Sequence, residues 1–218
     1  LSTRSRRCTS PTTCTENQFC NLRMSANRNL YGTIRDAAGN ERGANVDAQG
    51  SLATVVGNYI TNPTSTLTRP SDTTAYAIND LVASSTTAGS IVVPTATLAR
   101  YAAGSGTISG ICLTTPKTSG MDLVQLRVRF WRSAPTYTNG DNGAYAVATG
   151  AANYLGKAEV TLEQFGDGAT GCAPMYERAD IKTKLGSGTT LAWDIQTLTA
   201  FTPSSAQTFT ATLDNKQD

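Results

Sequence analysis

The sequence contains no histidine, the residue that most often acts as a general base and that commonly activates a serine or cysteine nucleophile. It also lacks the Gly-x-Ser-x-Gly turn of hydrolases, the phosphate-binding loop and the dinucleotide-binding fingerprint. Ser105 lies between two glycines, a pattern that is typical of a turn. Glu159 and Glu163 resemble a glycosidase acid pair, but strand alternation places both on an outward face beside Lys157. We therefore expect no catalytic residues and no enzyme activity.

Metal ligands are equally scarce. The sequence contains five cysteines: Cys8, Cys14, Cys20, Cys112 and Cys172. An odd number argues against a complete disulfide framework, and the first three are not arranged in the close Cys-x-x-Cys pairs of zinc sites. Asp141 lies in the segment NGDNG, which offers too few oxygen ligands for calcium and is typical of a turn. We expect no metal or other cofactor, and we interpret Cys112, inside an apolar run, as a small buried hydrophobic residue.

Charged residues make up only 16% of the chain and the net charge is +2, so neutral polar side chains must cover most of the surface. Residues 1–30 contain five arginines and one glutamate, a local balance of +4. An arm that contacts an acidic protein surface requires such charges, whereas nucleic-acid binding normally requires a larger basic patch with aromatic platforms. No segment approaches the roughly 20 apolar residues of a membrane helix. We expect a protein partner, with no direct contact to nucleic acid or membrane.

The clearest secondary-structure signal is an alternation of apolar and polar residues between positions 122 and 132. The apolar positions are Val124, Leu126, Val128 and Phe130. Such period-2 alternation is typical of a strand with one buried and one solvated face. The outward positions form a basic stripe with one aromatic residue: Arg127, Arg129, Trp131 and Arg132. We predict that Phe130 and, on a later strand, Trp193 are core residues, whereas Trp131 is a candidate interface anchor.

The N-terminal part of the chain differs from the rest in composition. Residues 1–30 show neither helical nor strand periodicity, and we interpret them as an extended arm that becomes ordered against a partner. Residues 31–51 contain four glycines among polar residues, the composition of a loop with room for a pair of short strands. Residues 52–60 are the first good strand candidate. We assign residues 1–60 to an extended N-terminal arm and wrapping segment, and residues 61–218 to the folded body.

Further strands are predicted at short, regular intervals through the body. They fall within residues 76–82, 91–101, 107–115, 144–149, 155–165, 175–185, 189–201 and 208–213. We expect a bulge at Gly110, edge strands near Pro94 and at 175–185, and a single helical turn at 151–155. The pattern predicts an all-β fold, a jelly-roll-like antiparallel β-sandwich with an extended N-terminal arm.

Five short motifs follow one another in the body at wide spacing. In chain order they are LTRPSDTTAYAINDLVA, FWRSAP, NGDNGAY, AANYLGKAEV and TLTAFTPSSAQTFTATL, within residues 65–213. This series resembles tailed-bacteriophage and prophage virion proteins, among them capsid decoration or cement proteins. The stretch GNERGANVDAQGSLATVVGN is also similar to phage structural proteins. The resemblance implies a β-sandwich body without catalytic residues, whereas the cysteine-containing arm has no counterpart in the pattern.

The resemblance implies a virion structural protein on the capsid surface, assembled in the bacterial host cytoplasm, that stabilises the head by bridging capsid subunits. The expected partner is the major capsid protein, and the expected oligomer is a trimer. The charge pattern adds candidate interface residues: Arg4, Arg6, Arg7, Arg127, Arg129, Trp131 and Arg132. The alternative function is a glycan- or receptor-binding head-fibre or tail module that uses loop aromatics such as Tyr137 and Tyr145. A virion hydrolase is a weaker third hypothesis, because the catalytic motifs are missing.

Overall fold

The computed structural model describes residues 59–217, apart from 118, 166–168 and 173–180, together with four short strands nearer the N-terminus. These strands are β1 (Arg23–Met24), β2 (Leu30–Tyr31), β3 (Ile34–Arg35) and β4 (Glu41–Arg42). The chain divides into two compact units, Leu1–Val55 and Val56–Asp218.

In the first unit the described residues form two antiparallel pairs, β1 with β2 and β3 with β4. The β3–β4 pair confirms the prediction of two short strands within residues 31–51. Residues 1–30 show no strand periodicity, yet Arg23–Met24 form a strand, because a strand of two residues is too short to produce a periodic pattern. Arg4, Arg6 and Arg7 lie outside the described residues, as does most of the strand expected at 52–60.

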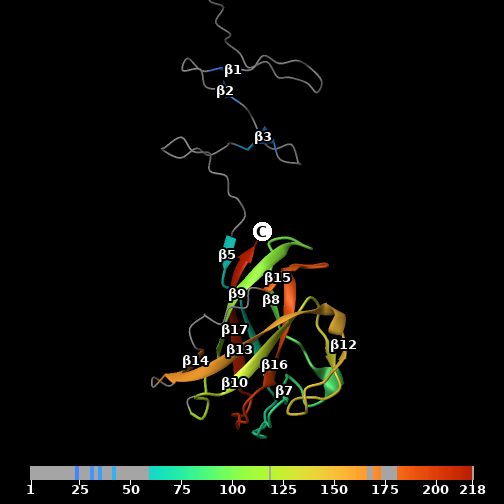
Figure 1. Cartoon of the computed structure of the whole chain (residues 1–218), viewed down its shortest axis with the longest axis vertical. Helices are drawn as coiled ribbons and strands as arrows, with labels where there is room; N and C mark the ends of the chain where they lie inside the picture. The colour runs from blue at the N-terminus through green and yellow to red at the C-terminus, as the bar shows by residue number, and fades with distance from the viewer. Residues whose placement is uncertain are drawn as a thin grey trace, which may run out of the picture. The chain divides into compact units, whose positions relative to one another are not determined.

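The second unit is built from two antiparallel sheets (Figure 1). One sheet has the order β14–β13–β10–β16–β7, with β8 also paired to β16. Its strands are β7 (Leu81–Val82), β8 (Thr95–Thr97), β10 (Gln125–Trp131), β13 (Tyr154–Phe165), β14 (Ala169–Cys172) and β16 (Thr190–Thr197). The other sheet has the order β15–β9–β17–β5, with β6 also paired to β17. Its strands are β5 (Tyr59–Thr61), β6 (Thr64–Thr68), β9 (Ser105–Thr114), β15 (Ile181–Lys184) and β17 (Thr208–Gln217).

The pairings between these strands are nested along the chain. The first long strand, β6, pairs with the last, β17, and β7 and β8 pair with β16. Further inward, β9 pairs with β15, and β10 pairs with β13. Two additional pairings, β9 with β17 and β10 with β16, join these strand pairs into the two sheets. The predicted all-β antiparallel sandwich is therefore confirmed.

The hydrophobic core contains side chains from both sheets. Phe130 of β10 and Trp193 of β16 are fully buried, as predicted, and they are register partners on adjacent strands. Phe209 of β17 is also fully buried, and its ring centroid lies 6.4 Å from that of Phe201. Burial of each such side chain contributes about 1.5–3 kcal/mol, so these rings are major sources of stability.

Strand β9 contains a bulge one residue from the predicted position. Asp214 pairs with Gly110 and Asn215 pairs with Ile108, which leaves Ser109 as the extra residue. The bulge shifts the alternation, so Cys112 lies on the outer side of β9 between two buried neighbours. Cys112 is half-buried and disulfide-bonded, and its interpretation as a small buried hydrophobic residue is therefore wrong.

Other local predictions are borne out with small differences. Strand β8, which follows Pro94, lies at the edge of its sheet, and β15 is an edge strand of the other sheet. The helical turn expected at 151–155 is a 3-10 helix, η2 (Ala151–Asn153), which is shorter because β13 begins at Tyr154. A second 3-10 helix, η1 (Ala88–Ser90), was not expected. A small hairpin of β11 (Thr136–Tyr137) and β12 (Val147–Thr149) completes the described strands.

Truncation of Phe130 or Trp193 to alanine is expected to lower the free energy of unfolding by about 3–5 kcal/mol, because each leaves a cavity in the core. Urea denaturation followed by far-ultraviolet circular dichroism measures the change. Thr64→Ala, at an exposed position of β6, is the control and should change the value by less than about 0.5 kcal/mol. A core variant as stable as this control would show that the assignment of the core is wrong.

Candidate functional site

The predicted basic stripe lies on the outer face of β10, where its arginines are bonded to neighbouring strands. Arg127 Nη2 lies 2.8 Å from Glu159 Oε1 on β13, and Arg127 Nη1 donates to Gln196 Oε1 on β16 at 3.1 Å. Arg129 Nη2 donates to the same Gln196 oxygen at 2.5 Å. Hydrogen bonds from Lys157 and Arg127 lower the pKa of Glu159. The two arginines therefore cross-link the sheet, and Glu159 has the solvated environment that the sequence predicted.

The remaining predicted interface residues do not join this stripe into one surface. Arg132 is exposed, and its Nε donates to the Lys184 carbonyl of the other sheet at 3.1 Å. Trp131 is only 3% exposed, so it is not available as the interface anchor that the sequence analysis expected. Its side chain does lie on the outer face of the sheet, but residues between β10 and β13 cover that part of the face.

The covering segment contains the β11–β12 hairpin and is fastened to the sheet by Asp194 of β16. Asp194 Oδ2 accepts hydrogen bonds from Trp131 Nε1 at 2.6 Å, from the Tyr137 hydroxyl at 2.7 Å and from the Tyr145 hydroxyl at 2.9 Å. The Arg129 guanidinium lies 4.0 Å from the centroid of the Tyr145 ring, a cation–π contact. Both tyrosine hydroxyls are therefore used within the fold, where Tyr137 is buried and Tyr145 is half-buried.

The Asp194 carboxylate is nearly removed from solvent. It is 3% exposed, and its second oxygen, Oδ1, is buried without a hydrogen-bond partner in the described structure. Burial raises the pKa of Asp194, although the three donors on Oδ2 act in the opposite direction. Burial, reinforced by the nearby Asp194 charge, also raises the pKa values of Tyr137 and Tyr145 well above the ordinary tyrosine range. Both hydroxyls therefore remain protonated donors at any physiological pH.

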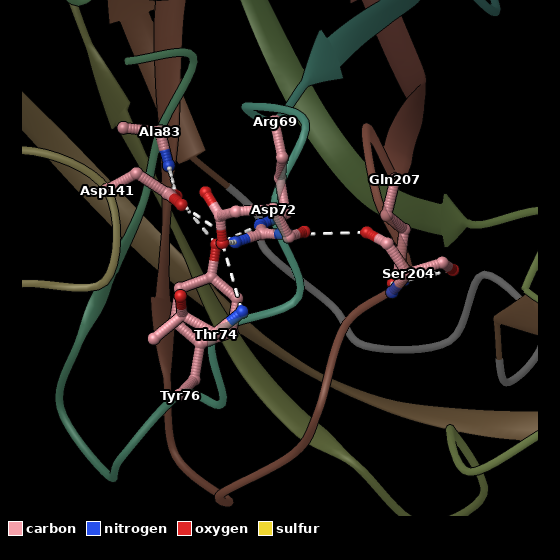
Figure 2. A network of polar contacts seen from close by, with 8 residues as sticks. All are labelled: Arg69, Asp72, Thr74, Tyr76, Ala83, Asp141, Ser204 and Gln207. Carbon is pink, nitrogen blue, oxygen red and sulfur yellow. Dashed lines mark hydrogen bonds and ion pairs between the residues drawn. The ribbon is translucent and has the colours of Figure 1, made fainter. Parts of the chain in front are cut away.

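A second buried polar cluster joins Arg69, Tyr76 and Asp141 (Figure 2). Arg69 Nη2 lies 2.8 Å from Asp141 Oδ2, and neither side chain is accessible to solvent. Asp141 Oδ1 accepts hydrogen bonds from the Tyr76 hydroxyl at 2.6 Å and from the Ala83 backbone N–H at 2.8 Å. The Tyr76 hydroxyl in turn accepts a hydrogen bond from Arg69 Nε. Asp141 lies in the turn that the sequence predicted, and its carboxylate is in addition half of a buried ion pair, which the sequence did not predict.

The remaining donors of Arg69 reach two more loops. Its Nη1 donates to the carbonyls of Asp72 at 3.2 Å and Ser204 at 3.3 Å, and its backbone N–H donates to the Gln207 carbonyl at 3.1 Å. On the other side of the ion pair, a Cβ at Gly140 would lie 1.9 Å from the Thr86 carbonyl oxygen. Only glycine allows that close backbone approach, which brings Asp141 to Arg69.

The described residues contain no group of three or more cysteine, aspartate and glutamate side chains arranged to hold a metal ion. The same part of the chain has no helix with the length and apolar character needed to cross a membrane. A scan against protein-family models, a search of curated proteins and a search of solved structures found no match to this chain.

Asp141→Ala is expected to lower the free energy of unfolding by about 3–5 kcal/mol, because it leaves the Arg69 guanidinium buried without its counter-charge. In a separate cycle, Arg69→Met combined with Asp141→Leu should cost less than the sum of Arg69→Met alone and Asp141→Leu alone. Urea denaturation of these three variants completes the double-mutant cycle. Additive effects would show that the two charges do not stabilise each other.

The raised pKa of Asp194 predicts a dependence of stability on pH. Because the folded protein binds this proton more tightly than the unfolded chain, the stability that Asp194 contributes is greatest at low pH. It falls as pH rises from about 4 through the raised folded pKa. Relative to Asp194→Asn, which cannot titrate, the wild type should therefore lose unfolding free energy across this interval. A series of urea denaturations at stepped pH measures the difference, and a difference that stays constant or grows with pH would contradict the assignment.

Proposed function

We propose that this protein is a structural component of a tailed-bacteriophage virion, a capsid decoration protein that binds the assembled head and bridges subunits of the major capsid protein. One observation carries the proposal: the separate sequence motifs that resemble decoration proteins meet in three dimensions. Arg69 and Tyr76 belong to LTRPSDTTAYAINDLVA, and Asp141 belongs to NGDNGAY. These motifs lie far apart in the chain, yet their side chains form one buried cluster.

The other motifs join the same framework. Ser204 and Gln207 come from TLTAFTPSSAQTFTATL and contact Arg69 through their carbonyls. Trp131 of FWRSAP packs on Tyr154 of AANYLGKAEV, with ring centroids 5.2 Å apart. Residues that hold one structure together have a physical reason to occur as a set. The resemblance therefore concerns the frame of the fold, which supports common ancestry with those virion proteins over chance similarity of short segments.

The proposal includes a jelly-roll topology for the body. Its support is the nested order of the pairings, in which the first long strand pairs with the last and each inner strand pairs with the corresponding returning strand. A jelly roll contains eight strands in two such Greek keys and is found in capsid proteins and in lectins. The topology by itself does not choose between these functions, and the motif evidence favours the virion.

Decoration would stabilise the head through mass action. A protein that binds the assembled shell, and not the free capsid subunit, adds its binding free energy to the shell alone. A standard interface buries about 1,200–2,000 Å², and capsid symmetry repeats each such contact many times. In this proposal the body binds as a trimer across subunit junctions, and Arg4, Arg6 and Arg7 of the first unit pair with carboxylates of the major capsid protein.

The proposal predicts that the purified protein binds empty capsids from which it is absent, and that bound particles withstand a higher temperature than bare ones. Co-sedimentation measures binding, and differential scanning fluorimetry of the capsid protein measures the temperature of rupture. A β-sandwich protein of similar size and charge is the control and should remain in the supernatant. Equal rupture temperatures with and without bound protein would remove the stabilising function, and failure to co-sediment would remove the capsid as partner.

A further inference from the structure

The outer face of the five-stranded sheet carries an open groove where β9 and β15 pair. The groove has a volume of about 450 Å³ and is lined by three register pairs of these two strands. They are Ser105 with Lys184, Gly106 with Thr183, and Thr107 with Lys182. The six-stranded sheet has its outer face partly covered by the β11–β12 segment. This groove instead lies at an edge of its sheet.

Three lysines gather at this place because strand register aligns them. Thr107 pairs with Lys182 on one side and with Lys216 of β17 on the other. The side chains of Lys182, Thr107 and Lys216 therefore form a row on one face of the sheet. Strands in a sheet are spaced about 4.8 Å apart, which places Lys182 and Lys216 about 10 Å from each other across Thr107. Lys184 follows two residues after Lys182 on the same face. All three lysines are exposed.

We call Lys182, Lys184, Lys216 and Thr107 the basic corner. Within the described part of the chain, none of its three ammonium groups forms an ion pair. This distinguishes them from Arg127 and Lys157 on the other sheet, which both bond to Glu159. The nearest described acid along β17 is Asp214, whose Oδ2 accepts a hydrogen bond from the Ser109 hydroxyl at 2.9 Å. Among the described residues, the basic corner therefore presents positive charge without a paired acid, in a chain whose net charge is only +2.

The chemistry of the corner favours carboxylates of a protein as its counterpart. Lysine ammonium groups are compact point charges, and the other residues that line the groove beside Lys182 and Lys184 are small: Ser105, Gly106, Thr107 and Thr183. Single-stranded nucleic acid normally requires aromatic rings on which bases stack, and no aromatic side chain among the described residues lines the groove. Three positive charges are also few for duplex DNA, whose binding depends on many phosphate contacts.

We propose that the basic corner is a docking surface for an acidic segment of a partner protein, which in the setting of the proposed function is a carboxylate-rich surface of the major capsid protein. This inference rests on the proposed function for the identity of the partner. The acidic character of the partner rests on the corner itself. Strand β5 pairs with β17 beside the corner, where Ile60 is the register partner of Lys216.

The test compares two variants that each lose two positive charges. Lys182→Gln with Lys216→Gln removes the row on either side of Thr107. The control, Lys117→Gln with Lys157→Gln, removes two lysines elsewhere in the body. All four positions are at least partly exposed, so both variants should unfold at nearly the same temperature as the wild type. Binding to empty capsids is measured by co-sedimentation at about 50 mM and about 300 mM sodium chloride.

The wild type and the control should bind alike, and both should weaken at the higher salt. The Lys182/Lys216 variant should bind about tenfold more weakly at low salt and show a smaller salt dependence, to which Lys184 and the arginines of the first unit still contribute. If it binds as tightly as the control, the basic corner is not the docking surface, although the proposed function stands.

A second measurement separates the corner from the proposed function. Retention of the protein on immobilised poly-L-glutamate should require Lys182 and Lys216. If the wild type shows this retention but does not bind capsids, the proposed function fails and the inference of an acidic partner stands. If the wild type, the Lys182/Lys216 variant and the control elute at the same salt concentration, the inference of an acidic partner is wrong. Stronger retention on duplex DNA than on poly-L-glutamate, dependent on the same lysines, would replace it with a nucleic acid.

Discussion

The body depends on the buried ion pair between Arg69 and Asp141. Removing two charges from water costs several kcal/mol per ion, and the cost is offset only when the remaining donors and acceptors are bonded. Here Tyr76, the Ala83 N–H and the carbonyls of Asp72 and Ser204 complete the set. These groups come from separate loops, so the ion pair is satisfied only when all of those loops are in place. The cluster therefore couples the closure of the loops to the formation of the sandwich.

The two sheets have different outer faces, and this difference divides the molecule into a supported side and an open side. On the six-stranded sheet, the segment held by Asp194 covers part of the outer face and forms a small second core with Leu81, Ala83 and Tyr137. On the five-stranded sheet, the outer positions of β6 and of the first half of β17 are threonines in register, and the Thr66 and Thr210 hydroxyls lie 2.9 Å apart. A face of this kind is polar without being charged.

The sequence predicted those features that depend on neighbouring residues and missed those that depend on distant ones. Alternation correctly placed Phe130 in the core, and it placed Trp131 on the opposite side of the sheet. Alternation reports which side a residue lies on, and it contains no information about what covers that side. The segment NGDNG correctly indicated a turn, but the partner of Asp141 is Arg69, 72 positions earlier in the chain. The bulge at Ser109 was expected within one residue, yet its effect on the exposure of Cys112 was not.

Low surface charge limits how the open side can bind a partner. A neutral face of threonine hydroxyls and methyl groups provides shape and hydrogen bonds, which determine how long a complex lasts, but it exerts no long-range attraction. Exposed charges at the edge of such a face act mainly on the rate and orientation of encounter. The basic corner lies at one end of the β9 and β17 strands that carry this face. In the proposed complex, the lysines would therefore orient the approach of an acidic partner, and the threonine face beside them would supply the close contact.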